Sequence, residues 1–247
     1  MTYTKRLDGR AVNELRPMKA RTGIIPNADG SAEFIIGKTQ AIAAVYGPRE
    51  MFPKFKQNPR SGILRCFYSM MPFSGSGERI RPGTSRRSQE IALVMTKALE
   101  PVVDLSAFPN AVVDVFVELP QTDAGTRCAA ISAAAMALAD AGIPMKDLVS
   151  AVAVGQVDGT VVADLTYDEE AYDGIVSDIP VAMIHNTKEF TLLQMDGEIS
   201  KAHLLKALHL AKEATEKIYE EQVRALKEKF AANEKTGEKR KAEQSEE

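Results

Sequence analysis

Residues 112–143 read VVDVFVELPQTDAGTRCAAISAAAMALADAGI, and this stretch decides the fold class. From Val112 to Leu119, apolar side chains take one face and carboxylates the other, which is the period-two pattern of a half-buried β-strand. A short turn ends at Gly125, and the alanine-rich segment 126–141 predicts a helix that is closed by Gly142. A strand that leads through a tight turn into a helix is typical of a chain that packs helices against a sheet.

The segments on either side repeat this arrangement. Apolar stretches flank Gly37-Lys38, Asp158-Gly159 and residues 186–189, so we expect three β-hairpins, and Asp158-Gly159 carries the strongest turn signal. Apolar residues at helical spacing predict further helices near residues 91–98 and 204–230. The sequence therefore predicts an α+β fold of two lobes, each with an antiparallel or mixed sheet and packed helices.

These elements divide the chain into four segments. We expect an N-terminal arm at 1–20, a first domain at 21–147, a second domain at 148–232 and a charged tail at 233–247. The tail has almost no apolar residues, which predicts disorder. The two lobes meet near residue 150, and a cleft between lobes is a common place for a functional site.

The composition excludes several classes of protein. The 247 residues are 45% apolar, which is ample for a core, and the net charge of −3 excludes a chain that is basic all over, so any nucleic-acid surface must be local. Cys66 and Cys128 lie in apolar segments and form no C-x-x-C pair, which indicates buried thiols in a reducing compartment. The first ten residues lack the apolar core of a signal peptide, and no apolar run approaches the roughly 18 residues of a membrane span. We expect a soluble, cytoplasmic protein with no membrane partner.

Gly125, Thr126 and Arg127 stand at the start of the alanine-rich helix. The first N–H groups of a helix lack intrahelical partners and, with the helix dipole, bind anions. Gly125 lets a ligand approach the backbone, Thr126 adds a hydroxyl, and the Arg127 fork suits a phosphate group. The alternative is an ordinary helix start in which Asp123 is the N-cap and Arg127 is a surface charge.

Two further stretches carry positive charge in unusual places. Arg86 and Arg87 follow the candidate N-cap Ser85, although cations in a first helical turn oppose the dipole. A bound anion would offset that cost, and pairing with Glu90 is the alternative. The loop 47–62 combines basic and aromatic side chains, as single-stranded nucleic acid requires, whereas the alternative is a solvated loop; these residues are Arg49, Phe52, Lys54, Phe55, Lys56 and Arg60.

The segment 164–178 contains six carboxylates. Magnesium usually takes one or two protein carboxylates together with substrate oxygens, so this segment is a candidate for Mg²⁺ binding. Asp178 directly precedes an apolar strand that would fix its position. For most of the other acids, an acidic surface loop is the simpler interpretation.

Taken together, these stretches resemble the RNase PH family of phosphorolytic 3′→5′ exoribonucleases. The resemblance extends from Arg6 to about Phe230, and the order and spacing of its motifs are specific. The motifs are RLDGR at 6–10, GKT at 37–39 with AVYGP at 44–48, YSMMPFS at 68–74, SRR at 85–87, DAGTR at 123–127 and the acidic segment that ends at Asp178. Within the family, the sequence of residues 71–74 and 178–182 is most similar to that of the catalytic RNase PH-like subunits of archaeal exosomes.

The resemblance implies a fold, an activity and a set of partners. It implies a two-lobed RNase PH fold with an N-terminal lobe like domain 2 of ribosomal protein S5. In the implied reaction, inorganic phosphate attacks the last phosphodiester of single-stranded RNA and releases a nucleoside diphosphate. The implied assembly is a hexameric ring of three such chains and three related inactive subunits, with RNA-binding cap proteins on one face. The alternatives are a homohexameric RNase PH that trims tRNA ends and a non-catalytic ring subunit that only binds RNA.

Roles for individual residues come from the same resemblance. Gly125, Thr126 and Arg127 would bind phosphate with help from Arg87, and Asp178 would orient Mg²⁺ or protonate the leaving oxygen, with Glu170 as a second catalytic acid. RNA would be held by Arg86 and Arg87 near its 3′ end, and by Arg60, Arg65 and Tyr68 along its path. Strict strand alternation places Arg65 and Tyr68 on opposite faces, so both contact RNA only if the strand bends or if each faces a different turn of the path.

Overall fold

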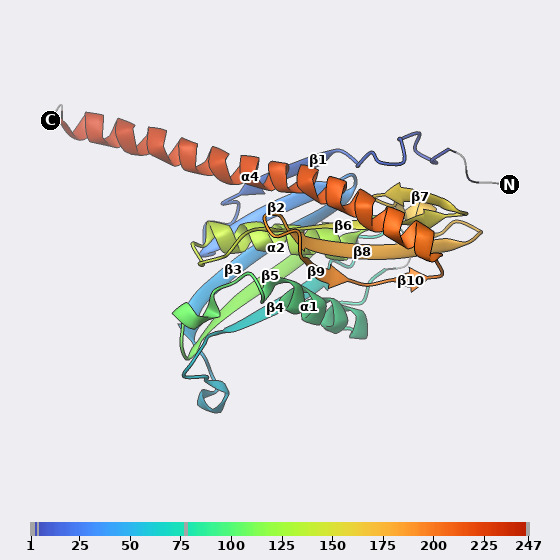
Figure 1. Cartoon of the computed structure of the whole chain (residues 1–247). Coiled ribbons are helices and arrows are strands. Elements are labelled where there is room, and N and C mark those ends of the chain that lie inside the picture. Colours follow the sequence, from blue (N-terminus) through green and yellow to red (C-terminus); the bar gives the residue numbers. More distant parts are fainter. Residues whose placement is uncertain (1–2, 4, 77–78, 246–247) are drawn as a thin grey trace.

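The computed structural model describes residues 3, 5–76 and 79–245, and for residues 232–245 it describes the backbone alone. Two β-sheets face each other across a buried helix, α2 (Thr126–Asp140), so the predicted α+β class is confirmed (Figure 1). The first sheet has the strand order β1-β2-β3-β5-β4. Its strands are β1 (Met18–Thr22), β2 (Gly30–Ile36), β3 (Thr39–Glu50), β4 (Ile63–Met70) and β5 (Ala111–Gln121).

The second sheet is antiparallel and has the order β10-β8-β6-β7, with β9 also paired to β8. Asp158 and Gly159 form the β6–β7 turn, as predicted, and both have positive φ angles. Gly37 likewise closes the predicted β2–β3 hairpin. The strands are β6 (Val149–Val157), β7 (Thr160–Ala163), β8 (Val176–Ile184), β9 (Phe190–Leu193) and β10 (Asp196–Gly197).

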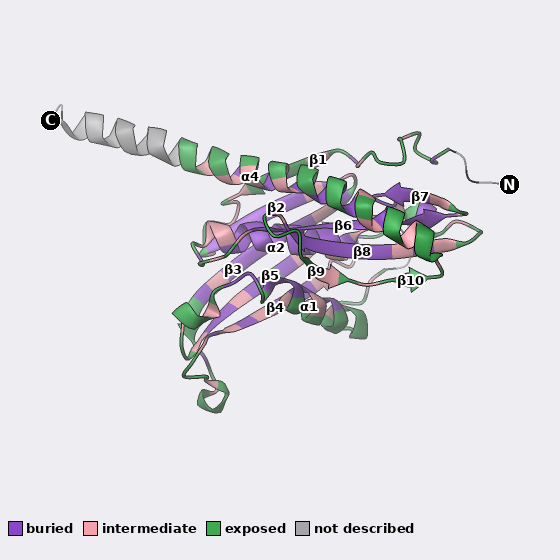
Figure 2. Ribbon diagram, viewed as in Figure 1, coloured by how far each residue is buried: buried purple, intermediate pink, exposed green. Residues whose placement is uncertain are grey.

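The helix α2 is the centre of the core. Twelve of its 15 residues are buried, because β2 and β3 cover one side and β6 covers another (Figure 2). A helix that is apolar all round belongs in the interior, and its alanines let both sheets approach closely. The other helices are α1 (Arg86–Leu99), the one-turn α3 (Tyr167–Glu170) and α4 (Lys201–Ser245), and α1 packs against β4. Two 3₁₀ turns are η1 (Lys54–Lys56) and η2 (Leu105–Ala107).

At both chain ends the structure differs from the sequence-based expectation. The last residues of the predicted arm, 18–20, form part of β1. Of the described residues before them, Arg6 and Arg16 are buried, because Arg6 bonds to the Ala163 carbonyl and to Glu169 and Arg16 bonds to Asp164. The helix α4 continues to Ser245, through most of the tail that the composition predicts to be disordered. The low apolar content predicted disorder, but Ala, Glu and Lys are also strong helix formers. Residues 246–247 of that tail lie outside the described residues.

Candidate active site

The start of α2 is open to a pocket. Gly125 is the N-cap residue, its φ of 68° is left-handed, and no side chain caps the helix. Asp123 is therefore not the N-cap that the simpler interpretation required, because its carboxylate accepts hydrogen bonds from Arg16 and from the Tyr167 backbone N–H. The first N–H groups of α2 thus have no side-chain cap, at a place where glycine leaves space for a ligand.

Arg127 is held in place by the second sheet. Its Nη1 donates a hydrogen bond of 2.6 Å to Oε1 of Gln194, which lies between β9 and β10. Because this bond crosses from one lobe to the other, it fixes the guanidinium over the seam between them. Arg127 is therefore not a freely moving surface charge.

The pocket joins the α2 start to carboxylates from the second lobe. It has a volume of about 370 Å³, and Gly125, Thr126 and Arg127 line it together with Glu170 and Asp178. Asp178 lies on β8 and Glu170 ends α3, so residues some 50 positions apart in the chain share one space. Arg87, Asp123 and Asp196 also line this pocket.

Both acids hold protons unusually tightly. Burial raises the pKa of Asp178 to about 6, and the nearby Asp196 raises it further while Arg127 and Arg87 lower it. Burial also raises the pKa of Glu170 to about 7, with an added contribution from Asp178. Acids whose pKa lies near neutrality are suited to donating a proton to a leaving group.

The two arginines of α1 lie in different surroundings. Ser85 caps α1 and forms a capping box with Ser88, so the predicted helix start is confirmed. Arg87 lines the pocket described above and also an adjoining pocket of about 350 Å³, which Thr126 and Glu170 share. Arg86 is exposed and lines neither pocket.

The remaining RNA-binding candidates lie farther out. Arg60 is exposed on the loop that precedes β4. On β4, Arg65 forms a bidentate ion pair with Asp114, at 2.7 and 2.8 Å. Tyr68 points to the other face, where burial raises its pKa, and its hydroxyl has no hydrogen-bond partner among the described residues. Tyr68 lines the adjoining pocket, whereas Arg60 and Arg65 do not.

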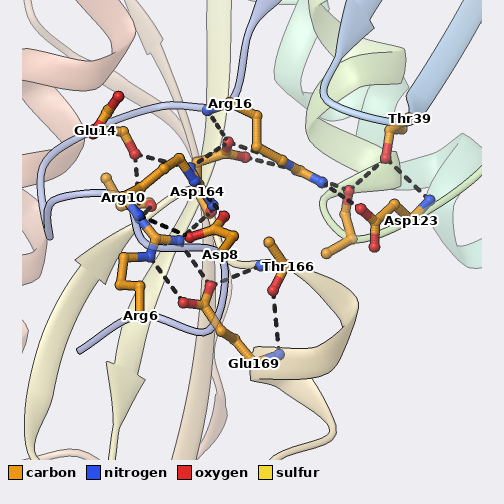
Figure 3. A network of polar contacts seen from close by, with 12 residues as sticks. Arg6, Asp8, Arg10, Glu14, Arg16, Thr39, Asp123, Asp164, Thr166 and Glu169 are labelled. Carbon is orange, nitrogen blue, oxygen red and sulfur yellow. Dashed lines mark hydrogen bonds and ion pairs between the residues drawn. The ribbon is translucent and has the colours of Figure 1, made fainter. Parts of the chain in front are cut away.

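A buried ionic network joins the N-terminal arm to the loop before α2 and to residues 164–169 (Figure 3). Arg16 donates two hydrogen bonds to the Asp164 carboxylate, at 2.6 and 2.9 Å, and further bonds to the Asp123 carboxylate and the Ala124 carbonyl. Arg6 pairs with Glu169, at 2.7 Å, and both side chains are almost fully buried. The arm thereby ties the acidic segment of the second lobe to the loop before α2.

Sequence reasoning missed Arg16 and Asp196, and it counted Asp164 among the acids of the segment 164–178 without giving it a partner. The partners Arg16 and Asp164 are 148 positions apart, so no local pattern pairs them. Asp196 enters the pocket from a two-residue strand that is too short to have a periodic signal. The only available signal for the pairing of Arg16 with Asp164 was that the arm has several arginines and that residues 164–178 have several carboxylates.

Family comparisons agree with this geometry. The profile of the 3′ exoribonuclease family matches the chain twice, with its RNase PH domain 1 over residues 14–144 and its domain 2 over residues 147–214. This chain belongs to the RNase PH family. The two matched domains carry the two halves of the pocket, with Gly125–Arg127 in the first and Glu170 and Asp178 in the second.

Curated relatives of this RNase PH family chain include archaeal proteins. The exosome complex component Rrp41 of Thermococcus kodakarensis is 51% identical over 226 residues, which are 92% of this chain and 90% of that protein. The Rrp41 of Methanopyrus kandleri is 49% identical over 228 residues, which are 92% and 94% of the two chains.

Solved structures share the RNase PH fold. Rice (Oryza sativa) Rrp46 superposes with a TM-score of 0.80 at 25% identity, covering 90% of this chain and all of that chain. A chain of the Archaeoglobus fulgidus exosome, solved with RNA bound to the active site, gives a TM-score of 0.75 at 22% identity, covering 88% and 92% of the two chains. The two-lobed fold that the resemblance implied is thus confirmed.

The site was also tested for its fit to a metal ion. The described residues contain no group of three or more His, Cys, Asp or Glu side chains placed to hold a metal. However, Oδ1 of Asp178 is buried without a hydrogen-bond partner in the described structure, and Glu170 and Asp196 line the same pocket. One or two carboxylates completed by substrate oxygens are a usual Mg²⁺ site, so the donors present fit that ion. The described helices include none that is long and apolar enough to cross a membrane.

Proposed function

We propose that this chain is a phosphate-dependent 3′→5′ exoribonuclease and the catalytic subunit of an archaeal exosome ring. The observation that carries this proposal is the pocket in which an uncapped helix start with Arg127 faces two carboxyl groups of raised pKa. About 50% identity to archaeal Rrp41 proteins over most of the chain supports it.

The phosphate site follows from the start of α2. Backbone N–H groups near Gly125, the Thr126 hydroxyl and the Arg127 fork would bind inorganic phosphate, with help from Arg87, which lines the same pocket. Phosphoryl transfer depends mostly on positioning and on positive charge around the phosphate oxygens. These groups supply both.

The carboxyl groups would supply the proton. A phosphate oxygen attacks the last phosphodiester, and the bond from that phosphorus to the 3′ oxygen of the preceding nucleotide breaks. Protonated Asp178, assisted by Glu170, donates its proton to the departing 3′ oxygen, and a nucleoside diphosphate is released. The raised pKa values keep part of each acid protonated near neutral pH.

Magnesium is part of the proposal. In the alternative role of Asp178, its ionised carboxylate would hold one Mg²⁺ with Asp196 and phosphate oxygens, and Glu170 would then supply the proton. Such an ion would neutralise charge on the reacting phosphate groups. The buried Oδ1 of Asp178, which has no hydrogen-bond partner in the described structure, is the oxygen that a divalent ion would satisfy.

The relatives support RNA and an exosome assembly as partners, and the composition of the ring and cap is part of this proposal. We expect single-stranded RNA as substrate, a related inactive RNase PH-like subunit in a ring of three and three, and RNA-binding cap proteins, in the cytoplasm. Because Arg86, Arg87, Arg127 and Asp178 are all present, the chain has the residues that a non-catalytic subunit would lack. A homohexameric tRNA-trimming enzyme is the competing assembly.

One assay tests the activity and the assembly together. The chain, alone and with a candidate partner subunit, is incubated with 3′-labelled single-stranded RNA, with and without phosphate and Mg²⁺. Nucleoside diphosphates that form only with phosphate would support the proposal, whereas monophosphates would show hydrolysis. Activity of the chain alone would favour the homohexamer, and no product with any partner would favour a binding-only role.

A further inference from the structure

Two phenylalanines form an exposed stack on the first sheet. Phe67 of β4 and Phe116 of β5 are directly paired in the register, and their rings lie 4.7 Å apart and nearly parallel, at 8°. They remain 43% and 37% exposed. Tyr46 of β3 contacts the far side of Phe116 edge-on, at 5.9 Å. Since Phe116 covers one face of the Phe67 ring, the π face that the stack leaves uncovered on the edge strand is the other face of Phe67.

Cationic groups flank this aromatic row. The Arg65 guanidinium lies 5.9 Å from the centre of the Phe67 ring, and the Arg49 guanidinium lies 5.0 Å from that of Tyr46. Arg65 is held beside the ring by its two bonds to Asp114, which engage Nε and Nη2 and leave Nη1 outside the pair. Arginines next to aromatic rings are the combination that binds the phosphates and stacks the bases of a single strand.

The stack opens into a groove that leads to the active site. Strand β4 is the last strand of its sheet, so a groove of about 630 Å³ runs between its edge and α1, lined by Arg65, Phe67 and Tyr68. This groove shares Tyr68, Ser69, Gly83 and Ser88 with the pocket of about 350 Å³, which in turn shares Arg87, Thr126 and Glu170 with the catalytic pocket. A groove along a strand edge is open to both faces of the strand, which is why Arg65 and Tyr68 reach the same groove.

We propose that the Phe67–Phe116 stack is a base-stacking platform for the single-stranded RNA that enters this groove. The inference rests on the proposed function, because the RNA is the strand whose 3′ end reaches the catalytic pocket. Phe67 lines the groove beside Tyr68, which the groove shares with the pocket that leads to the catalytic site, so the platform would take a base upstream of the reacting end. Stacking accepts any base, because every base has a π face, so the platform would add affinity without sequence preference.

The continuous groove favours RNA over a protein partner. The aromatic row is flanked by the guanidinium groups of Arg65 and Arg49, and such cations beside aromatic rings suit the phosphates and bases of a single strand. The aromatic row is also continuous with the phosphate site through shared lining residues.

The test uses RNA that carries 2-aminopurine at successive positions from the 3′ end, bound to the full-length chain without phosphate. We expect fluorescence quenching at one or two upstream positions and its loss in Phe67→Leu, which keeps apolar volume on the strand but removes the π face. Affinity for a long RNA should fall about 5- to 100-fold, while kcat on RNA too short to reach the stack stays unchanged. Phe190→Leu is the matched control, because Phe190 is a half-exposed ring beside Lys212 on the other sheet.

Each outcome has one meaning. Unchanged quenching and unchanged long-RNA affinity in Phe67→Leu would overturn the platform, as would equal effects of Phe190→Leu. A change of oligomeric mass in Phe67→Leu, measured by light scattering, would show that the aromatic row is a subunit contact instead. If quenching depends on Phe67 but no nucleoside diphosphate forms with phosphate, the proposed activity fails and the platform stands.

Discussion

At the scale of single residues, the carboxyl groups of Asp178 and Glu170 lower the stability of the folded protein at high pH. Burial raises their pKa values to about 6 and about 7, above the values of an unfolded chain. Between about pH 4 and 7 the native state therefore holds protons that the unfolded chain has released, and stability falls as pH rises through that range.

Asp178→Asn should therefore stabilise the protein and abolish its activity. We expect the variant to gain about 1–3 kcal/mol at pH 8 and to gain nothing near pH 2, where the carboxyl group is protonated in both states. Denaturant unfolding at the two pH values measures the difference. Asp168→Asn is the control, since Asp168 is exposed on the same acidic segment. An equal gain at both pH values would argue against a titrating carboxyl group.

Arg127 depends on its guanidinium shape as well as on its charge. The bond from Nη1 to Gln194 fixes one side of the fork and aims the other into the pocket. Arg127→Lys keeps the charge but loses the fork, and we expect the phosphorolysis rate to fall by about 10²- to 10³-fold. Gln194→Ala should show a smaller loss, mainly as a raised KM for phosphate. Wild-type kinetics in Arg127→Lys would contradict the bidentate phosphate site.

At the scale of elements, the N-terminal arm connects the two loops that lead into α2 and α3. Arg16 connects Asp164, which precedes α3, with Asp123 and Ala124, which precede α2. The arm therefore sets the distance between the phosphate-binding loop and the helix that carries Glu170.

Arg16→Met should weaken both the fold and the site. Removing one partner of a buried ion pair leaves Asp164 as an uncompensated buried charge, which costs about 3–5 kcal/mol. Loss of the Arg16 charge should also raise the pKa of Glu170, because Arg16 lowers it in the native protein. Urea unfolding and the pH profile of kcat measure these two effects. Arg224→Met, on an exposed pair with Glu221, should change stability by less than about 1 kcal/mol; a similar loss in both variants would refute the buried role of Arg16.

Local sequence patterns predicted most of these elements, but they did not predict which residues far apart in the chain pair with each other. The alternation of Val113, Val115 and Val117 and the Asp158-Gly159 turn are signals that lie within a few residues, and both were confirmed. The parallel pairing of β4 with β5 and the burial of Arg16 against Asp164 depend on contacts across 49 and 148 positions. The tail was misjudged because low hydrophobicity and high helix propensity coincide in its composition.

At the scale of the whole molecule, the two lobes share one core. Ser132 of α2 accepts two hydrogen bonds from outside the first lobe: its hydroxyl oxygen accepts one from the Ala151 N–H of β6, and its carbonyl oxygen accepts one from Gln222 of α4. Gln222 is fully buried and also bonds Ser150 and the Val149 carbonyl. The helix α4 therefore bonds both to α2 of the first lobe and to β6 of the second.

The lobes should consequently fold as one cooperative unit, although the family profile divides the chain near residue 145. Separate fragments 1–146 and 147–247 would expose opposite faces of the α2 contact, where 12 of 15 helix residues are buried in the intact chain. We expect each fragment alone to lack a cooperative thermal transition by circular dichroism, and a mixture of the two to recover one. The intact chain should unfold in a single step with probes in either lobe. A cooperative transition in fragment 1–146 alone would mean that the first sheet stabilises α2 without the second sheet. The catalytic pocket would then lie at a docking contact between two independent domains and not beside a shared core.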